Sequence, residues 1–298
     1  ADIRVRPVDA GSLRLDGGAM FGVVPKPLWS RRAPADGRNR ISLAMRCLLV
    51  ETSGARILVD TGLGSKEDAK FLDIYGVRNE GRPSRLEDAL RDLGVEPGDI
   101  DIVVNTHLHF DHAGGNTVRG PGGVRPAFPG AEYVIDRGEF DWAHSRNERV
   151  RASYLPDNFD PLVEHGRVRW LDEDEQEIVP GVRAVRTPGH TPFHRSIRIE
   201  LGERTLFYLA DLVPTAAHLP LPWIMGYDVE PLVTLESKRR WLGRAADEGW
   251  LLAFEHDPFF AWGWAGRDER GRPVLERPVE HPIGERLREE RPRDEEDS

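Results

Sequence analysis

The residues with the clearest chemical meaning lie in one short segment, THLHFDHAGG, at residues 106–115. The segment holds four side chains that bind metal ions when deprotonated: His107, His109, Asp111 and His112. In an extended chain, residues two apart point the same way, so His107 and His109 can share one metal ion. A turn at Phe110 lets Asp111 and His112 face a neighbouring position. Without a metal, these crowded groups would repel one another on protonation, so the pattern predicts a metal-binding loop.

Three further candidate ligands follow later in the chain. His190 lies in the sequence TPGHTP after an apolar strand, Asp211 follows the apolar run 205–210, and His256 follows residues 251–254. Ligands at the ends of several strands can converge on one edge of a sheet, where α/β proteins usually hold their sites. Because the chain has a single cysteine, Cys47, a metal site must be built from His, Asp and Glu.

Hydrophobic patterning predicts the strands and helices that position these residues. The stretch 100–105 is short and nearly all apolar, which is typical of a strand buried on both faces, and it runs straight into Thr106. Other strands are expected at 41–50, 56–60, 133–135, 167–170, 176–179, 182–186, 195–200, 205–209 and 250–255. Helices are expected at 86–93 (capped by Ser84), 137–154 and 232–248. We therefore expect one α/β domain over residues 1–284, followed by a charged, solvated tail at 285–298.

Composition and charge exclude several classes of protein. Of the 298 residues, 39% are hydrophobic, which is enough for a core, and no window reaches the length of a transmembrane helix. The net charge of -10 is opposite to that of a typical nucleic-acid binder. Residues 1–4 lack the features of a signal peptide, and one cysteine cannot form an intrachain disulfide. These observations predict a cytoplasmic protein with no nucleic-acid or membrane partner.

With this ligand set, the chain resembles the metallo-β-lactamase superfamily of metal-dependent hydrolases over about residues 41–260. The resemblance implies a four-layer αββα sandwich. It also implies the metal ligands: His107, His109 and His190 for one ion, Asp111, His112 and His256 for the second, and Asp211 bridging the two. Asp60, in an Asp-Thr-Gly turn, resembles the carboxylate that orients a ligand histidine in this family.

The implied cofactor is a pair of divalent metal ions. Nitrogen and carboxylate ligands suit zinc first, with iron, manganese, cobalt and nickel as alternatives. A metal lowers the pKa of bound water from 15.7 to about 7, so a metal-bound hydroxide can attack a carbonyl or phosphoryl centre. The second metal would stabilise the charge that develops on the electrophilic oxygen. Asp111 and Asp211 are the candidate catalytic residues, and Asp111 would hydrogen-bond the nucleophile or protonate the leaving group.

The string THLHFDHAGGN is similar to that of the N-acyl-homoserine lactonases, in which Phe110 would line the acyl-chain pocket. Well-known lactonases carry a tyrosine three residues after the bridging aspartate, where this chain has Pro214. The methyl parathion hydrolase group, which acts on phosphotriesters and aryl esters, also lacks that arrangement and is the alternative. A thioester hydrolase of the glyoxalase II kind is the third candidate.

Apolar and aromatic residues near the predicted ligands, notably in the segment LPLPWIMGY at 219–227, predict an apolar cleft. The candidate substrate-contacting residues are Met20, Phe21, Phe110, His194, His218, Trp223, Ile224, Tyr227 and Phe259. Such a cleft suits a small molecule with a neutral ester-like group and an apolar tail. Packing in the core is the alternative role for these residues, and a homodimer interface is another if they are exposed.

Other members of the superfamily fit less well. A nuclease needs a basic surface for its phosphodiester substrate, which this acidic chain does not offer. Diiron oxygen-reducing members usually carry a carboxylate where His109 lies and have an attached flavin-binding domain. True β-lactamases of several groups carry a cysteine where Asp211 lies, and they are usually exported.

Overall fold

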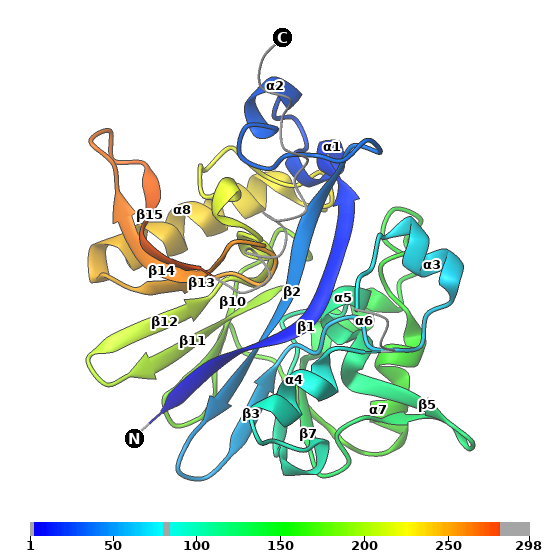
Figure 1. Cartoon of the computed structure of the whole chain (residues 1–298). Helices are drawn as coiled ribbons and strands as arrows, with labels where there is room; N and C mark the ends of the chain where they lie inside the picture. The colour runs from blue at the N-terminus through cyan, green and yellow to red at the C-terminus, as the bar shows by residue number, and fades with distance from the viewer. Residues whose placement is uncertain (1–2, 80–83, 281–298) are drawn as a thin grey trace.

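The structure is a computed structural model and describes residues 3–79 and 84–280. Within this part of the chain, two large β-sheets pack face to face, with helices on their outer faces (Figure 1). The first sheet has the order β1 (Arg4–Asp16), β2 (Arg40–Glu51), β3 (Arg56–Val59), β4 (Ile102–Val104), β7 (Glu132–Asp136) and β8 (Val168–Leu171). The second has the order β15 (Pro273–Glu280), β14 (Phe260–Arg267), β13 (Leu251–Ala253), β12 (Arg204–Tyr208), β11 (Arg195–Leu201), β10 (Val182–Arg186) and β9 (Glu175–Val179).

The remaining elements are short, apart from one long helix. A small hairpin is formed by β5 (Thr117–Gly120) and β6 (Gly123–Pro126). The helices are α1 (Gly17–Phe21), α2 (Lys26–Trp29), α3 (Ala69–Ile74), α4 (Leu86–Asp92), α5 (Phe110–Ala113), α6 (Arg137–Ala143), α7 (Asp160–Glu164) and α8 (Pro231–Glu248). None of the helices in the described ranges is long and apolar enough to cross a membrane. The predicted tail at 285–298 lies outside the described residues, and the single domain over 1–284 stays a prediction.

Among the described residues, alternation along the strands creates three apolar cores. In β12, Leu206 and Tyr208 face the core between the sheets, whereas Phe207 faces the core under α8. In β3, Ile57 faces the core between the sheets, whereas Leu58 faces the core that includes residues of α4. Successive residues of a strand point to opposite faces, so each sheet is apolar on both sides and needs a layer on each. The result is the expected four-layer αββα sandwich.

Strand direction brings the predicted ligands together. In the first sheet β3, β4 and β7 are parallel neighbours, and in the second β12 and β13 are parallel. The carboxyl ends of parallel strands meet at one edge, so Asp60 follows β3 next to the loop that follows β4. Asp211 and His256 likewise follow β12 and β13. Two residues at these ends, Asp60 and Ala210, have φ of 56° and 45°, a strained left-handed conformation that is tolerated where function requires it.

The predicted helix at 137–154 is wrong beyond its first two turns. Helix α6 ends at Ala143, and turns and a 3-10 segment follow. Residues 144–149 are all polar and exposed, so no apolar face continues the helix, and Arg146 adopts a φ of 51°. Helix α4 begins at the predicted residue, but its N-cap is Arg85 and not Ser84, whose hydroxyl oxygen accepts a hydrogen bond from the backbone N–H of Leu86.

A buried lysine fixes the irregular segment that follows Asp211. Lys238 lies on α8, and its Nζ donates hydrogen bonds of 2.7–2.8 Å to the carbonyl oxygens of His218, Pro220 and Trp223. The His218 ring in turn stacks on Phe21 of α1, with ring centroids 4.4 Å apart. Backbone carbonyls of an irregular segment lack ladder partners, so the ammonium group satisfies oxygens that would otherwise be buried without one.

We expect Lys238→Met to lower the free energy of unfolding by about 3 kcal/mol, because it leaves buried carbonyls without a donor. Lys70→Met, the same exchange at an exposed position of α3, is the matched control and should change stability by less than about 0.5 kcal/mol. Urea denaturation of both variants measures the difference. Equal stability of the two variants would contradict the role of Lys238.

Candidate metal centre

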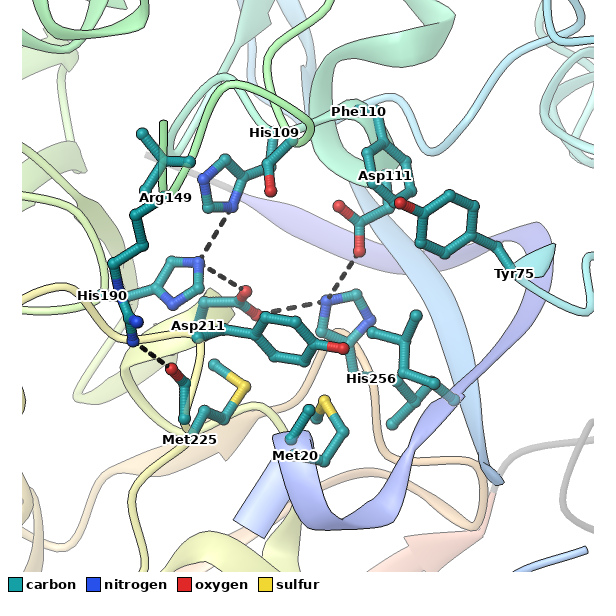
Figure 2. A pocket seen from close by; sticks show the side chains of 17 residues that line it. Met20, Tyr75, His109, Phe110, Asp111, Arg149, His190, Asp211, Met225 and His256 are labelled. Atoms are coloured by element: carbon teal, nitrogen blue, oxygen red, sulfur yellow. Dashed lines mark hydrogen bonds and ion pairs between the residues drawn. The ribbon is translucent and has the colours of Figure 1, made fainter. Parts of the chain in front are cut away.

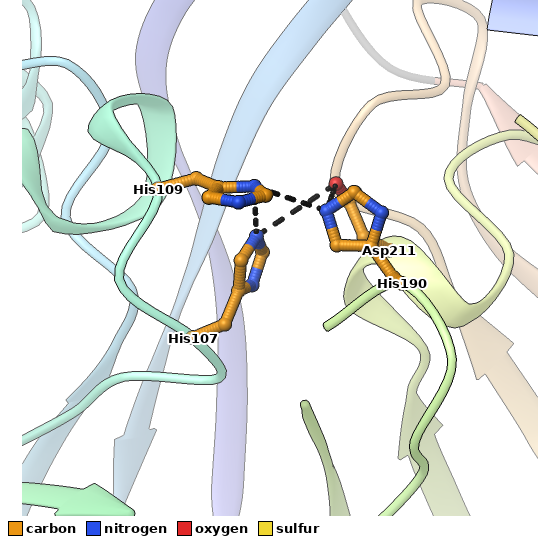
Figure 3. Close-up of side chains that lie close together, drawn as sticks. All are labelled: His107, His109, His190 and Asp211. Carbon is orange, nitrogen blue, oxygen red and sulfur yellow. Dashed lines mark hydrogen bonds and ion pairs between the residues drawn. The ribbon is translucent and has the colours of Figure 1, made fainter. Parts of the chain in front are cut away.

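Three imidazole nitrogens converge at the first candidate metal site. His109 Nδ1 lies 3.1 Å from His107 Nε2 and 3.0 Å from His190 Nε2 (Figure 3). Asp211 Oδ2 lies 3.0 Å from His190 Nε2. These four residues come from loops after β4, β10 and β12, and all are buried.

A second group lies beside the first. His256 Nε2 lies 3.1 Å from His112 Nε2, and Asp111 Oδ2 lies 3.7 Å from His256 Nε2. The Asp211 carboxylate is between the two groups, since its Oδ1 is 3.1 Å from His256 Nε2 while its Oδ2 faces His190 (Figure 2). The arrangement therefore matches the predicted ligand set, including the position of Asp211.

Each of these histidines has one ring nitrogen that faces the centre of the site (the inner nitrogen) and one that faces away from it (the outer nitrogen). Hydrogen bonds to the outer nitrogens orient the inner ones. Asp60 Oδ1 accepts the backbone N–H of Thr106 at 2.8 Å, and Oδ2 accepts the Thr106 hydroxyl at 2.7 Å. The same Oδ2 lies 3.1 Å from His112 Nδ1, and the Thr106 hydroxyl oxygen lies 3.1 Å from His107 Nδ1. Asp60 is thus within hydrogen-bond distance of one candidate ligand directly and acts on another through Thr106.

Sequence reasoning missed two carboxylates with the same function. Asp228 Oδ1 lies 2.9 Å from His190 Nδ1, and Glu255 Oε2 lies 2.9 Å from His112 Nδ1. Glu255 directly precedes His256 at a strand end, a signal that could have identified it. Asp228 lies three residues before α8 and follows none of the predicted strands, so the local sequence gave no signal for it. His256 Nδ1 donates to the carbonyl oxygen of Ala44 at 2.7 Å.

The donor set fits divalent metal ions. When these rings are neutral, outer acceptors take the N–H groups of His107, His112, His190 and His256, which leaves the inner nitrogens with lone pairs. The inner nitrogens of His112 and His256, for example, face each other at 3.1 Å. Lone pairs facing each other repel unless a cation lies between them. Ligands bound to one zinc ion at 2.0–2.2 Å lie roughly 3–4 Å apart, which matches these separations. Within the described residues, Asp211 Oδ1 is also buried without a hydrogen-bond donor.

Burial and neighbouring charges set the protonation states. Burial, together with the adjacent imidazoles, holds the pKa of His107 and of His109 well below the ordinary value. Burial alone would raise the pKa of Asp211, but the surrounding histidines outweigh it and hold that pKa well below its usual range. Burial also raises the pKa of Glu255 to about 8. Against the effect of burial, the Asp211 carboxylate raises the pKa of His190 to about 10 and that of His256 to about 9. These rings therefore hold a proton that a bound metal ion would displace, because imidazole binds metal in its neutral form.

A cavity of about 320 Å³ opens onto Asp111, His190, Asp211 and His256 (Figure 2). Of the predicted substrate-contacting residues, Met20, Phe110 and Tyr227 line it. Met225 and Gly226, which also line the cavity, lie in the segment 219–227 that predicted an apolar cleft. The cavity has further lining residues that the sequence did not indicate: Leu15, Ala19, Leu43, Tyr75, Arg149, Val150 and Ser153. The Nη2 of Arg149 donates to the carbonyl oxygen of Gly226 at 2.7 Å, which links two sides of the cavity.

The other predicted contacts lie elsewhere, and this corrects the sequence interpretation. Phe21 is fully buried between Trp29 and His218, Trp223 packs edge-on against Phe21, and Ile224 does not line the cavity. Phe259 lines a separate cavity of about 720 Å³. Aromatic residues in apolar runs fill the core as readily as they line a cleft, so composition could not separate the two roles.

His194 is another correction, since it lies behind the metal centre. Its Nε2 accepts the backbone N–H of Asp211 at 3.1 Å, and its Nδ1 lies 2.8 Å from the Thr187 hydroxyl. Burial lowers the pKa of His194 to about 3, so the ring is neutral and can accept from Asp211. His194 therefore positions the Asp211 backbone and does not line the cavity.

Comparison with known proteins identifies the family. The model of the metallo-β-lactamase superfamily matches residues 46–256. The chain belongs to the metallo-β-lactamase superfamily. One solved structure is described as a "probable metal-dependent hydrolase" from Staphylococcus aureus. Its sequence is 30% identical to the present chain, and the two structures superpose with a TM-score of 0.84. That match covers 94% of this chain and 99% of the other.

Two other members of the superfamily are N-acyl homoserine lactone hydrolases. The lactonase from Bacillus cereus is 32% identical over 178 residues. These residues are 57% of this chain and 64% of the relative, so the match spans slightly less than two thirds of that protein. A solved hydrolase with N-hexanoyl-L-homoserine bound at its catalytic metal centre is 26% identical, with a TM-score of 0.65 and coverage of 86% and 94%. The expected superfamily and fold are confirmed, and the roles of individual ligands stay predictions.

We expect the purified protein to hold about two metal ions per chain. Asp211→Ala should lose more metal than His256→Ala, because Asp211 faces both histidine groups whereas His256 faces one. Elemental analysis after gel filtration measures the metal content, with Asp92→Ala, an exposed carboxylate on α4, as the control. If Asp211→Ala kept both ions, Asp211 would not bridge them.

Asp60→Ala should weaken metal affinity by about 10- to 100-fold, because it removes the carboxylate that accepts hydrogen bonds from both His112 and Thr106. Competition with a chelator measures the affinity, and circular dichroism reports whether the fold is intact. The same Asp92→Ala control should bind metal normally. Unchanged affinity in a folded Asp60→Ala variant would show that the other acceptors suffice.

Proposed function

We propose that the protein is a hydrolase that opens the ring of lactones carrying an apolar tail. It would use two divalent metal ions, for which zinc is the first candidate. The observation that carries this proposal is the position of Asp211, between two histidine groups and at the inner end of a cavity with an apolar wall. The lactone hydrolases among the relatives support the same reaction class. N-acyl-homoserine lactones are the first candidate substrates.

The metal ions would be held by the predicted ligands: His107, His109 and His190 for one, Asp111, His112 and His256 for the other, with Asp211 shared. When bound, they supply a nucleophile at neutral pH and polarise the carbonyl oxygen of the substrate. Asp111 lines the cavity, so its carboxylate can take the proton of the attacking nucleophile. It can then return that proton to the ring oxygen that leaves as a hydroxyl group.

The cavity wall supports a substrate with a neutral head and an apolar tail. Met20, Leu43, Phe110 and Met225 provide apolar surface, and the volume of about 320 Å³ is typical of a small-molecule site. Arg149 is a donor on the lining and can bind a carbonyl oxygen of the substrate. The net charge of -10 disfavours a polyanionic substrate.

A phosphotriester or aryl ester hydrolase is the second candidate. Pro214 stands three residues after Asp211, where well-known lactonases carry a tyrosine, and its carbonyl oxygen accepts the backbone N–H of His256 at 3.1 Å. The position therefore supports a ligand loop and offers no hydroxyl to the substrate. The predicted homodimer and cytoplasmic location stay predictions.

We expect kcat/KM for acyl-homoserine lactones to rise with chain length until the cavity is full, by up to about fourfold per methylene, since each buried methylene contributes about 0.8 kcal/mol. Met20→Ala should reduce that dependence, whereas Met45→Ala, a buried methionine that does not line the cavity, should keep it. The measurement is kcat/KM from butanoyl to dodecanoyl lactones, beside paraoxon and an aryl acetate. A flat profile would contradict the apolar cavity, and efficient paraoxon hydrolysis without lactone turnover would favour the second candidate.

A further inference from the structure

A buried glutamate lies close to the candidate metal centre but is not one of its ligands. Glu139 is in the first turn of α6 and is 1% exposed. The helix is capped by Asp136, whose Oδ1 accepts the backbone N–H groups of Gly138 and Glu139. An aspartate cap with a glutamate three residues later is the pattern of a capping box, in which the glutamate reaches back to the cap. Glu139 instead points into the protein.

The Glu139 carboxylate accepts hydrogen bonds from three separate segments. Its Oε1 accepts the Tyr154 hydroxyl at 2.8 Å and the backbone N–H of Leu108 at 3.2 Å. Its Oε2 accepts the Thr191 hydroxyl at 2.6 Å. These donors are neutral, and among the ion pairs of residues 3–79 and 84–280 none involves Glu139. A buried carboxylate is costly to ionise, and burial raises the pKa of Glu139.

Each of these donors is next to a ligand of the first metal ion. Leu108 lies between His107 and His109 in the chain, and Thr191 follows His190. The Tyr154 ring packs against the His109 ring, with centroids 4.7 Å apart. A single carboxylate therefore contacts the surroundings of every histidine in that group.

Helix α6 is itself fixed against the loop that carries His190. A Cβ atom on Gly138 would lie 2.3 Å from the ring of Phe193, so only a glycine permits this close approach of the helix to the loop. Asp136 also forms a 2.6 Å ion pair with Arg195, at the start of β11. The first turn of α6 is thus held in place independently of Glu139.

Tyr154 connects this arrangement to the substrate cavity. Its neighbour Ser153 lines the cavity and accepts the backbone N–H of Phe110, another lining residue, at 2.9 Å. Val150 of the same segment also lines the cavity. The Glu139 carboxylate therefore contacts both the ligand loops and the segment that forms one wall of the cavity.

We propose that Glu139 is a positioning residue that holds His107, His109 and His190 at the separations one metal ion requires and ties them, through Tyr154, to the cavity wall. The inference rests on the proposed metallohydrolase function. The negative charge of Glu139 would also be compensated by the cation that these histidines bind, which would offset the cost of burying a carboxylate whose direct partners are neutral.

The test compares Glu139→Gln with Glu164→Gln, the same exchange at an exposed position of α7. We expect Glu139→Gln to release one of the two metal ions about 10- to 100-fold faster into a chelator, because an amide group cannot accept all three hydrogen bonds. The cobalt-substituted variant should also show an altered visible absorption spectrum, which reports ligand geometry. Glu164→Gln should match the unsubstituted protein in both measurements.

A second variant covers the case in which Glu139→Gln does not fold. Thr191→Val removes one donor and should accelerate release of the same ion several-fold. In the double variant the effects should be less than additive, because both changes break one network. Normal metal release and a normal cobalt spectrum in folded Glu139→Gln would overturn the proposal, and so would normal release in Thr191→Val.

These measurements do not use a substrate. Failure of the lactonase assignment would appear as absent turnover in the unsubstituted protein, with the metal results unaffected. Failure of the Glu139 proposal would appear as unchanged metal release and an unchanged cobalt spectrum in Glu139→Gln, while the unsubstituted protein hydrolyses lactones normally. As a further check, Tyr154→Phe should raise KM more than it lowers kcat, since its hydroxyl links the carboxylate to the cavity wall.

Discussion

The convergence of buried imidazole nitrogens is the constraint on which the rest of the structure depends. The Nε2 atoms of His107 and His190 lie 3.1 and 3.0 Å from His109 Nδ1, and beside them the Nε2 atoms of His112 and His256 lie 3.1 Å apart. Such an arrangement is unfavourable unless a cation lies among the rings, and it must exist before the cation binds with high affinity. The fold therefore has to supply rigid support from several directions.

That support comes from strand ends and from close backbone contacts. Asp60 ends β3 in a left-handed conformation and orients the ligand loop through Thr106, while the backbone N–H of Thr61 donates to the His112 carbonyl oxygen at 2.7 Å. On the opposite side, Gly189 lies so close to Thr234 of α8 that a Cβ atom would be 2.2 Å from its hydroxyl oxygen. Both sheets and the long helix thus contact the loops that carry the ligands.

Polar and apolar groups are separated around this centre. Behind the histidines lie acceptors that fix the rings, namely Asp228, Glu255 and the Ala44 carbonyl oxygen. In front of them lies a cavity with an apolar wall, which suits a substrate that brings one polar reacting group and little charge. The orientation of the ligands and the selection of the substrate are therefore assigned to different layers of side chains, and Glu139 and Tyr154 connect the two.

The ligand types, their order and their positions after strands are properties of the local sequence, and they predicted an α/β domain whose candidate ligands converge at one sheet edge. The four-layer sandwich was predicted only through the resemblance to the metallo-β-lactamase superfamily. The nearly all-apolar stretch 100–105, which contains β4, likewise predicted a strand that is buried on both faces. Only the tertiary structure decided which acceptor each ring has, because these contacts join residues far apart in the chain, such as His256 and Ala44. It also decided that Phe21, Trp223 and His194 do not line the cavity that Met20 lines. An apolar or aromatic residue has the same local signature in a core as in a cavity, and the packing of distant segments determines which of the two it joins.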